Sequence, residues 1–204
     1  MKKLFLTSYF AGTVDQFKQF IKTNQISAKE VTFITTAGNV EDYTGYIDEG
    51  RQALQDLGFQ VNDLDIASTA TASVTQAIAA AEILFITGGN TFYLLQELKR
   101  QDLLGLISAR IKAGIPYVGE SAGAIVLAPT ITYNKMMDDA TVAPALTDDR
   151  GFALTDFYPL PHQGEEPFKE AVEEIIATYQ DQLKLLPINN SQAIMVNGDS
   201  YQII

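Results

Sequence analysis

Ser121 lies at the centre of residues 119–123, Gly-Glu-Ser-Ala-Gly, which match the pattern G-x-S-x-G. The pattern follows a strand-like run at 115–119 and precedes a segment that can start a helix. A tight strand-to-helix turn strains the backbone at the serine and exposes its hydroxyl, as in hydrolases that use a serine nucleophile. The alternative is an ordinary βα turn with Ser121 as a helix N-cap. We favour the nucleophile.

His162 is the only histidine among the 204 residues, and there is no cysteine. A disulfide framework, a thiolate zinc site, a cysteine nucleophile and a histidine-rich metal cluster are therefore excluded. A serine hydroxyl needs a nearby base to become nucleophilic, and His162 is the one imidazole that can serve. It lies in the predicted loop 160–164, where the alternative is a surface histidine without a role.

An imidazole base needs an acceptor that orients it. Asp138, Asp139 and Asp156 lie between the serine and the histidine, which gives the chain order Ser, Asp, His. Each is equally explained as a solvated loop carboxylate, and spacing alone does not choose among them.

Gly88 and Gly89 follow an apolar run at 83–87 and precede a helical pattern. Their backbone amides, with that of Ala122, can form an oxyanion hole. Phosphate binding at the helix N-terminus is the alternative, but neither G-x-G-x-x-G nor a P-loop lysine is present. Asn90, the next residue, is either a pocket residue or an N-cap.

Strand-like and helix-like segments alternate along the chain. Strands are expected at 4–9, 31–35, 59–64, 83–87 and 115–119, with amphipathic helical patterns at 14–21, 43–57, 94–98 and 103–111. This alternation predicts an α/β fold with a doubly wound, mostly parallel sheet. Residues 129–161 carry four prolines and predict loops and short strands, a helix is expected at 168–179, and 193–204 predict a closing hairpin. No linker or repeat divides residues 1–204, so we expect one domain.

The chain carries a formal net charge of −11 and has a sequence pI of about 4.4. A strongly negative field repels phosphate backbones, so nucleic acid is not an expected partner. Polar residues interrupt the apolar start after Leu6, and no run reaches the ~20 apolar residues of a membrane span. We expect no membrane association and a cytoplasmic location.

Residues 88–92, 119–124 and 160–162, in that order, resemble the peptidase E and cyanophycinase family of serine peptidases over nearly the whole chain. The resemblance implies a three-layer fold like that of class I glutamine amidotransferases. It also implies no cofactor or metal, and small peptides, such as dipeptides with an N-terminal aspartate, as substrates. By the resemblance Ser121 is the nucleophile and His162 the base. Gly89 and Ala122 are the oxyanion donors, and Asp138 or Asp139 is the acid.

Some residues depart from the family pattern near these motifs. Glu120 is unusual beside the nucleophile and either binds a substrate amine or faces solvent, and Glu165 lies in an altered loop that we expect to shape the pocket. Arg150 is the better candidate for the cation that an aspartyl substrate needs. Two other functions stay open: an esterase of the α/β-hydrolase type, and a binding protein that kept the fold and lost catalysis.

Overall fold

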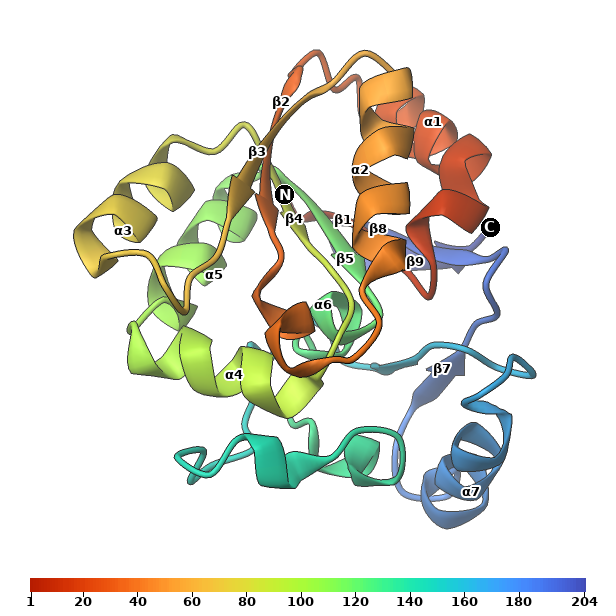
Figure 1. Ribbon diagram of the computed structural model, residues 1–204. Coiled ribbons are helices and arrows are strands. Elements are labelled where there is room, and N and C mark those ends of the chain that lie inside the picture. Colours follow the sequence, from red (N-terminus) through yellow and green to blue (C-terminus); the bar gives the residue numbers. More distant parts are fainter.

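The computed structural model describes all residues, Met1–Ile204. A seven-stranded sheet in the order β3-β2-β4-β5-β1-β8-β9 runs through the molecule (Figure 1). Its strands are β1 (Lys3–Thr7), β2 (Glu30–Ile34), β3 (Gln60–Leu64), β4 (Ile83–Ile86), β5 (Pro116–Glu120), β8 (Ala193–Asn197) and β9 (Ser200–Ile203). The first five are parallel, and the hairpin β8–β9 adds antiparallel to β1.

Alternation along the strands divides the core into two layers. Phe5 packs on one face of the sheet with Phe17 of α1 (Val14–Thr23) and Leu54 of α2 (Gly45–Asp56). Its neighbours Leu4 and Leu6 face the other core, beneath the helices drawn on the opposite side of the sheet in Figure 1. These helices are α3 (Thr71–Ala80), α4 (Thr91–Arg100), α5 (Leu104–Ala113) and the short α6 (Ala122–Ile125). The predicted doubly wound, three-layer arrangement is confirmed.

The sequence patterns missed some elements. Only Val74 and Ile78 are buried in α3, so its apolar periodicity is too weak to stand out. Residues 129–161 contain the 3₁₀ turns η3 (Thr132–Met136) and η4 (Ala140–Val142) and the strand β6 (Tyr158–Leu160). After α7 (Lys169–Tyr179), the strand β7 (Leu185–Pro187) pairs in parallel with β6 as a separate two-stranded sheet. The first two 3₁₀ turns of the chain are η1 (Phe10–Thr13) and η2 (Thr36–Val40).

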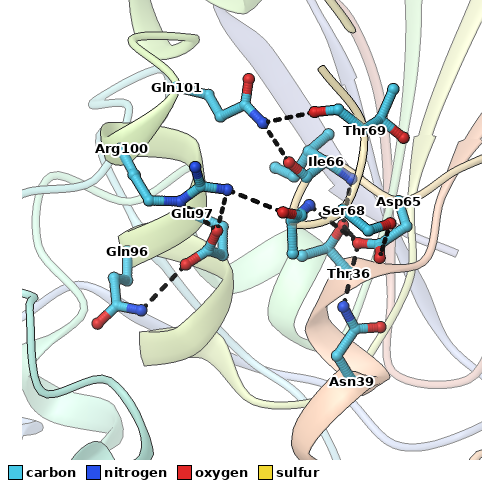
Figure 2. A network of polar contacts seen from close by, with 11 residues as sticks. Thr36, Asn39, Asp65, Ile66, Ser68, Thr69, Gln96, Glu97, Arg100 and Gln101 are labelled. Carbon is cyan, nitrogen blue, oxygen red and sulfur yellow. Dashed lines mark hydrogen bonds and ion pairs between the residues drawn. The ribbon is translucent and has the colours of Figure 1, made fainter. Parts of the chain in front are cut away.

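A polar network fixes η2 against the end of β3 and against α4 (Figure 2). Asp65 accepts hydrogen bonds from the Thr36 hydroxyl at 2.9 Å and the Asn39 amide at 3.0 Å. Gln101, the residue that follows α4, donates to the carbonyl oxygen of Thr69 at 3.0 Å. The network matters for the site because the next residue of η2, Ala37, accepts a 2.8 Å hydrogen bond from the backbone N–H of Asn90.

No helix is both long and apolar enough to cross a lipid bilayer.

Candidate active site

Ser121 stands at the turn between β5 and α6 with φ +46° and ψ −107°. Few non-glycine residues adopt a positive φ, and such strain is concentrated at functional positions. The turn closes only because its flanks are glycines. A Cβ at Gly119 would lie 2.5 Å from the carbonyl oxygen of Gly123, and one at Gly123 would lie 2.1 Å from that of Ile86. The G-x-S-x-G pattern thus reflects close backbone packing on both sides of the serine.

His162 lies directly against this serine. The Oγ of Ser121 and the Nε2 of His162 are 2.9 Å apart, so the two residues picked out by the sequence are brought together. The imidazole stacks on the ring of Phe168, with centroids 4.7 Å apart and planes at 28°. That packing limits the rotation of the imidazole and shields it from water.

The other imidazole nitrogen meets Asn190. Its Oδ1 lies 3.0 Å from the Nδ1 of His162, so Nδ1 carries the proton and Nε2 is left as the acceptor for the serine hydroxyl. The parallel pair β6–β7 explains the meeting, because Leu160 aligns with Pro187 and both chains leave the pair at the same end. Asn190 is further held by Gly12, where a Cβ would lie 2.3 Å from the Asn190 carbonyl oxygen.

Ser8, the residue after β1, ties these loops together. It accepts a 3.0 Å hydrogen bond from the backbone N–H of His162 and donates one of 3.0 Å to the carbonyl oxygen of Ile188. The central sheet is thereby joined to both arms of the β6–β7 pair. The positions of His162 and Asn190 therefore depend on a buried serine that no motif in the sequence marked.

Burial lowers the pKa of His162 below its ordinary value of 6.5, while the hydrogen bond to Asn190 and the charge of Glu165 act in the opposite direction. A lowered pKa keeps the imidazole neutral at neutral pH. In that state it can accept a proton from the hydroxyl of Ser121.

None of the predicted aspartates contacts His162, and Asn190 occupies the place expected for them. Asp138 accepts hydrogen bonds from the Thr91 N–H and the Asn134 amide, both at 2.8 Å, at the start of α4. Asp139 caps η4 through Thr141. Asp156 is exposed and pairs with Lys184. The physical reason is that the segment carrying Asp138 and Asp139 is bound to the start of α4, through the Thr91 N–H to Asp138 and the Asn90 amide to the carbonyl oxygen of Asp139.

The backbone N–H groups expected to form the oxyanion hole differ in whether they already have a hydrogen-bond acceptor. The Gly88 N–H points to the Glu120 carboxylate at 3.4 Å, so it is already engaged. The Gly89 N–H has no acceptor within the chain, and Gly89 lines the cavity beside Ser121. Glycine is required there, since φ is +123° and a Cβ would lie 2.3 Å from the backbone of Ala37. Ala122 begins α6 directly after the serine.

The cavity in front of Ser121 has a volume of about 390 Å³. Asn90 lines it, but its side chain is occupied as the α4 cap, accepting from the Tyr93 N–H and donating to the carbonyl oxygen of Asp139. Glu120 lines it as well. Glu165 does not line the cavity, although the sequence predicted it: it accepts a hydrogen bond from the backbone N–H of Asn190 at 3.5 Å, and its neighbour Glu166 lines the cavity instead. Arg150 is 83% exposed, pairs with Asp148 and does not line the cavity.

Three carboxyl groups of the cavity wall have raised pKa values, because burial raises the pKa of Glu41 as well as those of Glu120 and Asp138. Burial raises the pKa of Glu120 to about 7, although N–H donors from Phe10 and Gly88 partly offset it. Burial likewise raises the pKa of Asp138 to about 6, against its hydrogen bonds from Thr91 and Asn134. Shifted carboxyls beside a nucleophile are typical of functional pockets.

Comparison with known proteins assigns the chain to a protein family. The model of peptidase family S51 matches residues 4–204. The chain belongs to peptidase family S51. An uncharacterized peptidase of Pasteurella multocida, PM1590, is 45% identical over 98% of this chain and 96% of its own length. Peptidase E of Salmonella paratyphi A is 35% identical over 68% of this chain and 58% of its own length.

Solved structures agree with the S51 assignment. A crystal structure of a candidate peptidase E protein from Listeria monocytogenes superimposes with a TM-score of 0.94 at 42% identity, covering 100% of this chain and 98% of that one. A peptidase from an acI-B1 Actinobacterium shares the fold, with a TM-score of 0.73 at 19% identity, over 100% of this chain and 87% of its own. The predicted resemblance is confirmed, and the S51 chain is placed among the peptidases, a class of hydrolases.

The sequence patterns did not mark Asn190 or Ser8 at this S51 site, nor Tyr46, which lines the cavity beside Ser121. Asn190 follows a short apolar run at 185–188, and this position after a strand is the one signal that could have marked it. Its pairing with His162 depends on the β6–β7 contact between distant segments. Such a contact leaves no local pattern.

Proposed function

We propose that this protein is a serine-type peptidase that hydrolyses short peptides through an acyl-enzyme. The observation that carries the proposal is the hydrogen-bonded series Ser121–His162–Asn190, with the serine on a strained turn at the mouth of a cavity. A nucleophile, a base and a group that orients the base are the parts that acyl transfer requires.

In the first half of the reaction, Ser121 Oγ attacks the scissile carbonyl carbon while its proton passes to Nε2 of His162. The Gly89 and Ala122 amides then face the oxyanion. The imidazolium returns the proton to the leaving nitrogen, the C–N bond breaks and the amine departs. A water molecule then attacks the acyl-enzyme ester and gives a proton to Nε2 of His162. The ester bond breaks, and Ser121 Oγ takes that proton back. Asn190 keeps Nδ1 protonated throughout but supplies no negative charge.

The preference for Asp-X dipeptides gains no support from the cavity, because neither lysine nor arginine lines it. An aspartyl side chain would need such a partner. The small peptide substrate and the cytoplasmic location remain predictions from the sequence.

The proposal is tested by measuring hydrolysis of a dipeptide library and of p-nitrophenyl esters by the wild-type protein and by Ser121→Ala and His162→Ala. We expect peptide turnover to fall at least about a thousandfold in both variants. Ser200→Ala, at an exposed serine of β9, is the matched control and should keep full activity. Unchanged peptide hydrolysis in Ser121→Ala would refute the mechanism, and turnover of esters alone would favour the esterase.

A further inference from the structure

The ionisable side chains of the cavity wall are almost all acidic. Five carboxylate side chains line it and no lysine or arginine does; the five are Glu41, Glu120, Asp138, Asp139 and Glu166. His162 is the only basic side chain at the wall, and its lowered pKa keeps it neutral. A bound substrate therefore meets a field of one sign.

Two of the five lie inside the cavity without a cation. Glu120 is 2% exposed, and its partners are two backbone N–H groups, from Phe10 at 2.8 Å and Gly88 at 3.4 Å. Asp138 uses Oδ2 for its hydrogen bonds, while Oδ1 makes none within the chain. Neither carboxylate takes part in an ion pair. Burying an unpaired carboxylate costs free energy, so the buried Glu120 destabilises the fold, and the half-buried Asp138 does so to a smaller extent.

Tyr46 provides a second, independent observation at the same cavity. Tyr46 lines the same cavity, and its hydroxyl is buried and has no hydrogen-bond partner. Its ring lies next to the nucleophile, because a Cβ at Gly88 would lie 3.4 Å from Tyr46 Cε2 and 3.3 Å from Ser121 Cβ. Glu41, Glu120 and Asp138 all act on the Tyr46 hydroxyl to raise its pKa, after burial, which places it among the carboxylates.

An aromatic ring beside unpaired carboxylates is the usual environment for an organic cation. No three histidine, aspartate or glutamate side chains of the chain are grouped to hold a metal ion, so the wall is better matched to an ammonium or guanidinium group. An acidic side chain in the same place would be repelled by Glu120 and Asp138 and would find no partner.

Building on the proposed peptidase function, we propose that the cavity selects peptides with a cationic group beside the scissile bond, bound by Glu120, Asp138 and Tyr46. The cation is either the α-ammonium of the first residue or the side chain of a lysine or arginine, since both present the same N–H donors.

The test compares kcat/KM for Lys-Leu, norleucine-Leu and Asp-Leu, each with a free and an acetylated N-terminus. We expect Lys-Leu or the free amine to exceed its uncharged counterpart by about tenfold or more, with Asp-Leu slowest. Loss of rate on acetylation identifies the α-ammonium, and a gain from norleucine to lysine identifies the side chain. Equal rates across both comparisons, or a preference for Asp-Leu, would overturn the inference while leaving Ser121 chemistry intact.

Variants locate the effect. Glu120→Gln and Asp138→Asn remove one charge each and keep a hydrogen-bond acceptor, so either should reduce the cationic preference about tenfold. Glu30→Gln, an exposed residue at the opposite end of the parallel strands, removes the same charge and should leave the preference unchanged. An undiminished preference in both cavity variants would contradict the assignment.

A binding measurement separates this inference from the proposed function. Calorimetry on Ser121→Ala with Lys-Leu, norleucine-Leu and their acetylated forms needs no turnover. Tighter binding of the cationic peptides supports the inference even if the protein hydrolyses none of them. Equal affinities for charged and uncharged peptides would refute it, whatever the role of Ser121.

Discussion

Asn190 gives the imidazole of His162 a neutral acceptor at the position where a Ser-His-Asp triad has a carboxylate. An amide oxygen fixes the tautomer, but it stabilises the imidazolium less than a negative charge would. Burial keeps the pKa of His162 below its ordinary value, because the hydrogen bond to Asn190 raises it too little to compensate. The base is then available over a wider range of acidic pH, at the cost of weaker stabilisation of the protonated state.

Asn190→Asp tests this balance. A carboxylate 3.0 Å from Nδ1 favours the imidazolium, so the pKa of His162 should rise by about 1 unit or more. Because His162 is the only histidine, an NMR titration of its ring protons reports the value without ambiguity. The acidic limb of the kcat/KM profile should move to higher pH by the same amount. Asn62→Asp, exposed on β3, is the control, and equal shifts in the two variants would contradict the assigned contact.

Removal of the Glu120 carboxylate should stabilise the protein in a pH-dependent way. Its pKa is about 7 in the fold and has an ordinary value of 4.5, so the folded state holds this proton more tightly than the unfolded chain. The Glu120 charge therefore does not lower the free energy of unfolding below pH 4.5, and lowers it progressively as the pH rises from 4.5 to about 7. Glu120→Gln should be more stable than wild type at pH 8, by up to about 3 kcal/mol, with a smaller difference at pH 5.

Urea unfolding of Glu120→Gln at the two pH values measures the effect, with Glu30→Gln as the exposed control. A difference from wild type that is the same at pH 5 and pH 8 would show that Glu120 is not the group that titrates.

At the scale of elements, the turn between β5 and α6 depends on its two glycines. A methyl group at Gly123 would overlap the Ile86 carbonyl, so Gly123→Ala should displace β4 from α6 and destabilise the fold by about 1–3 kcal/mol. Gly105→Ala, inside α5 with open space around its Cα, should stabilise by about 0.5–1 kcal/mol. Thermal unfolding of both variants decides the point, and a neutral Gly123→Ala would show that the close packing is not required.

The elements also show what the sequence can and cannot predict. The turn at Ser121 was predictable because its pattern is local: a strand, two glycines and a short helix in succession. The β6–β7 pair was not, since Tyr158–Leu160 and Leu185–Pro187 are short and lie on either side of α7. Asn190 reaches His162 only through that pair, and for this reason the sequence predicts aspartates between Ser121 and His162 as the orienting residue instead.

At the scale of the whole molecule, the layered sheet brings the ends of β1, β4 and β5 to one edge. Ser8, Gly88 and Ser121 come from these three strands and meet at the cavity, as ligand sites in open α/β sheets do. Buried apolar strands made the doubly wound, mostly parallel sheet predictable from the pattern of the chain, but not the order of its strands. The addition of β8–β9 to β1 was not predictable, because a hairpin can extend a sheet at either edge.

The central claim is that Ser121 is a nucleophile activated by His162. Mass spectrometry of the intact protein after reaction with a fluorophosphonate measures this most directly. We expect one adduct, located on the peptide that contains Ser121, absent in Ser121→Ala and formed about a hundredfold or more slowly in His162→Ala. Folded wild-type protein that stays unlabelled, or an adduct on a different serine, would contradict the account and favour a binding protein that kept the fold.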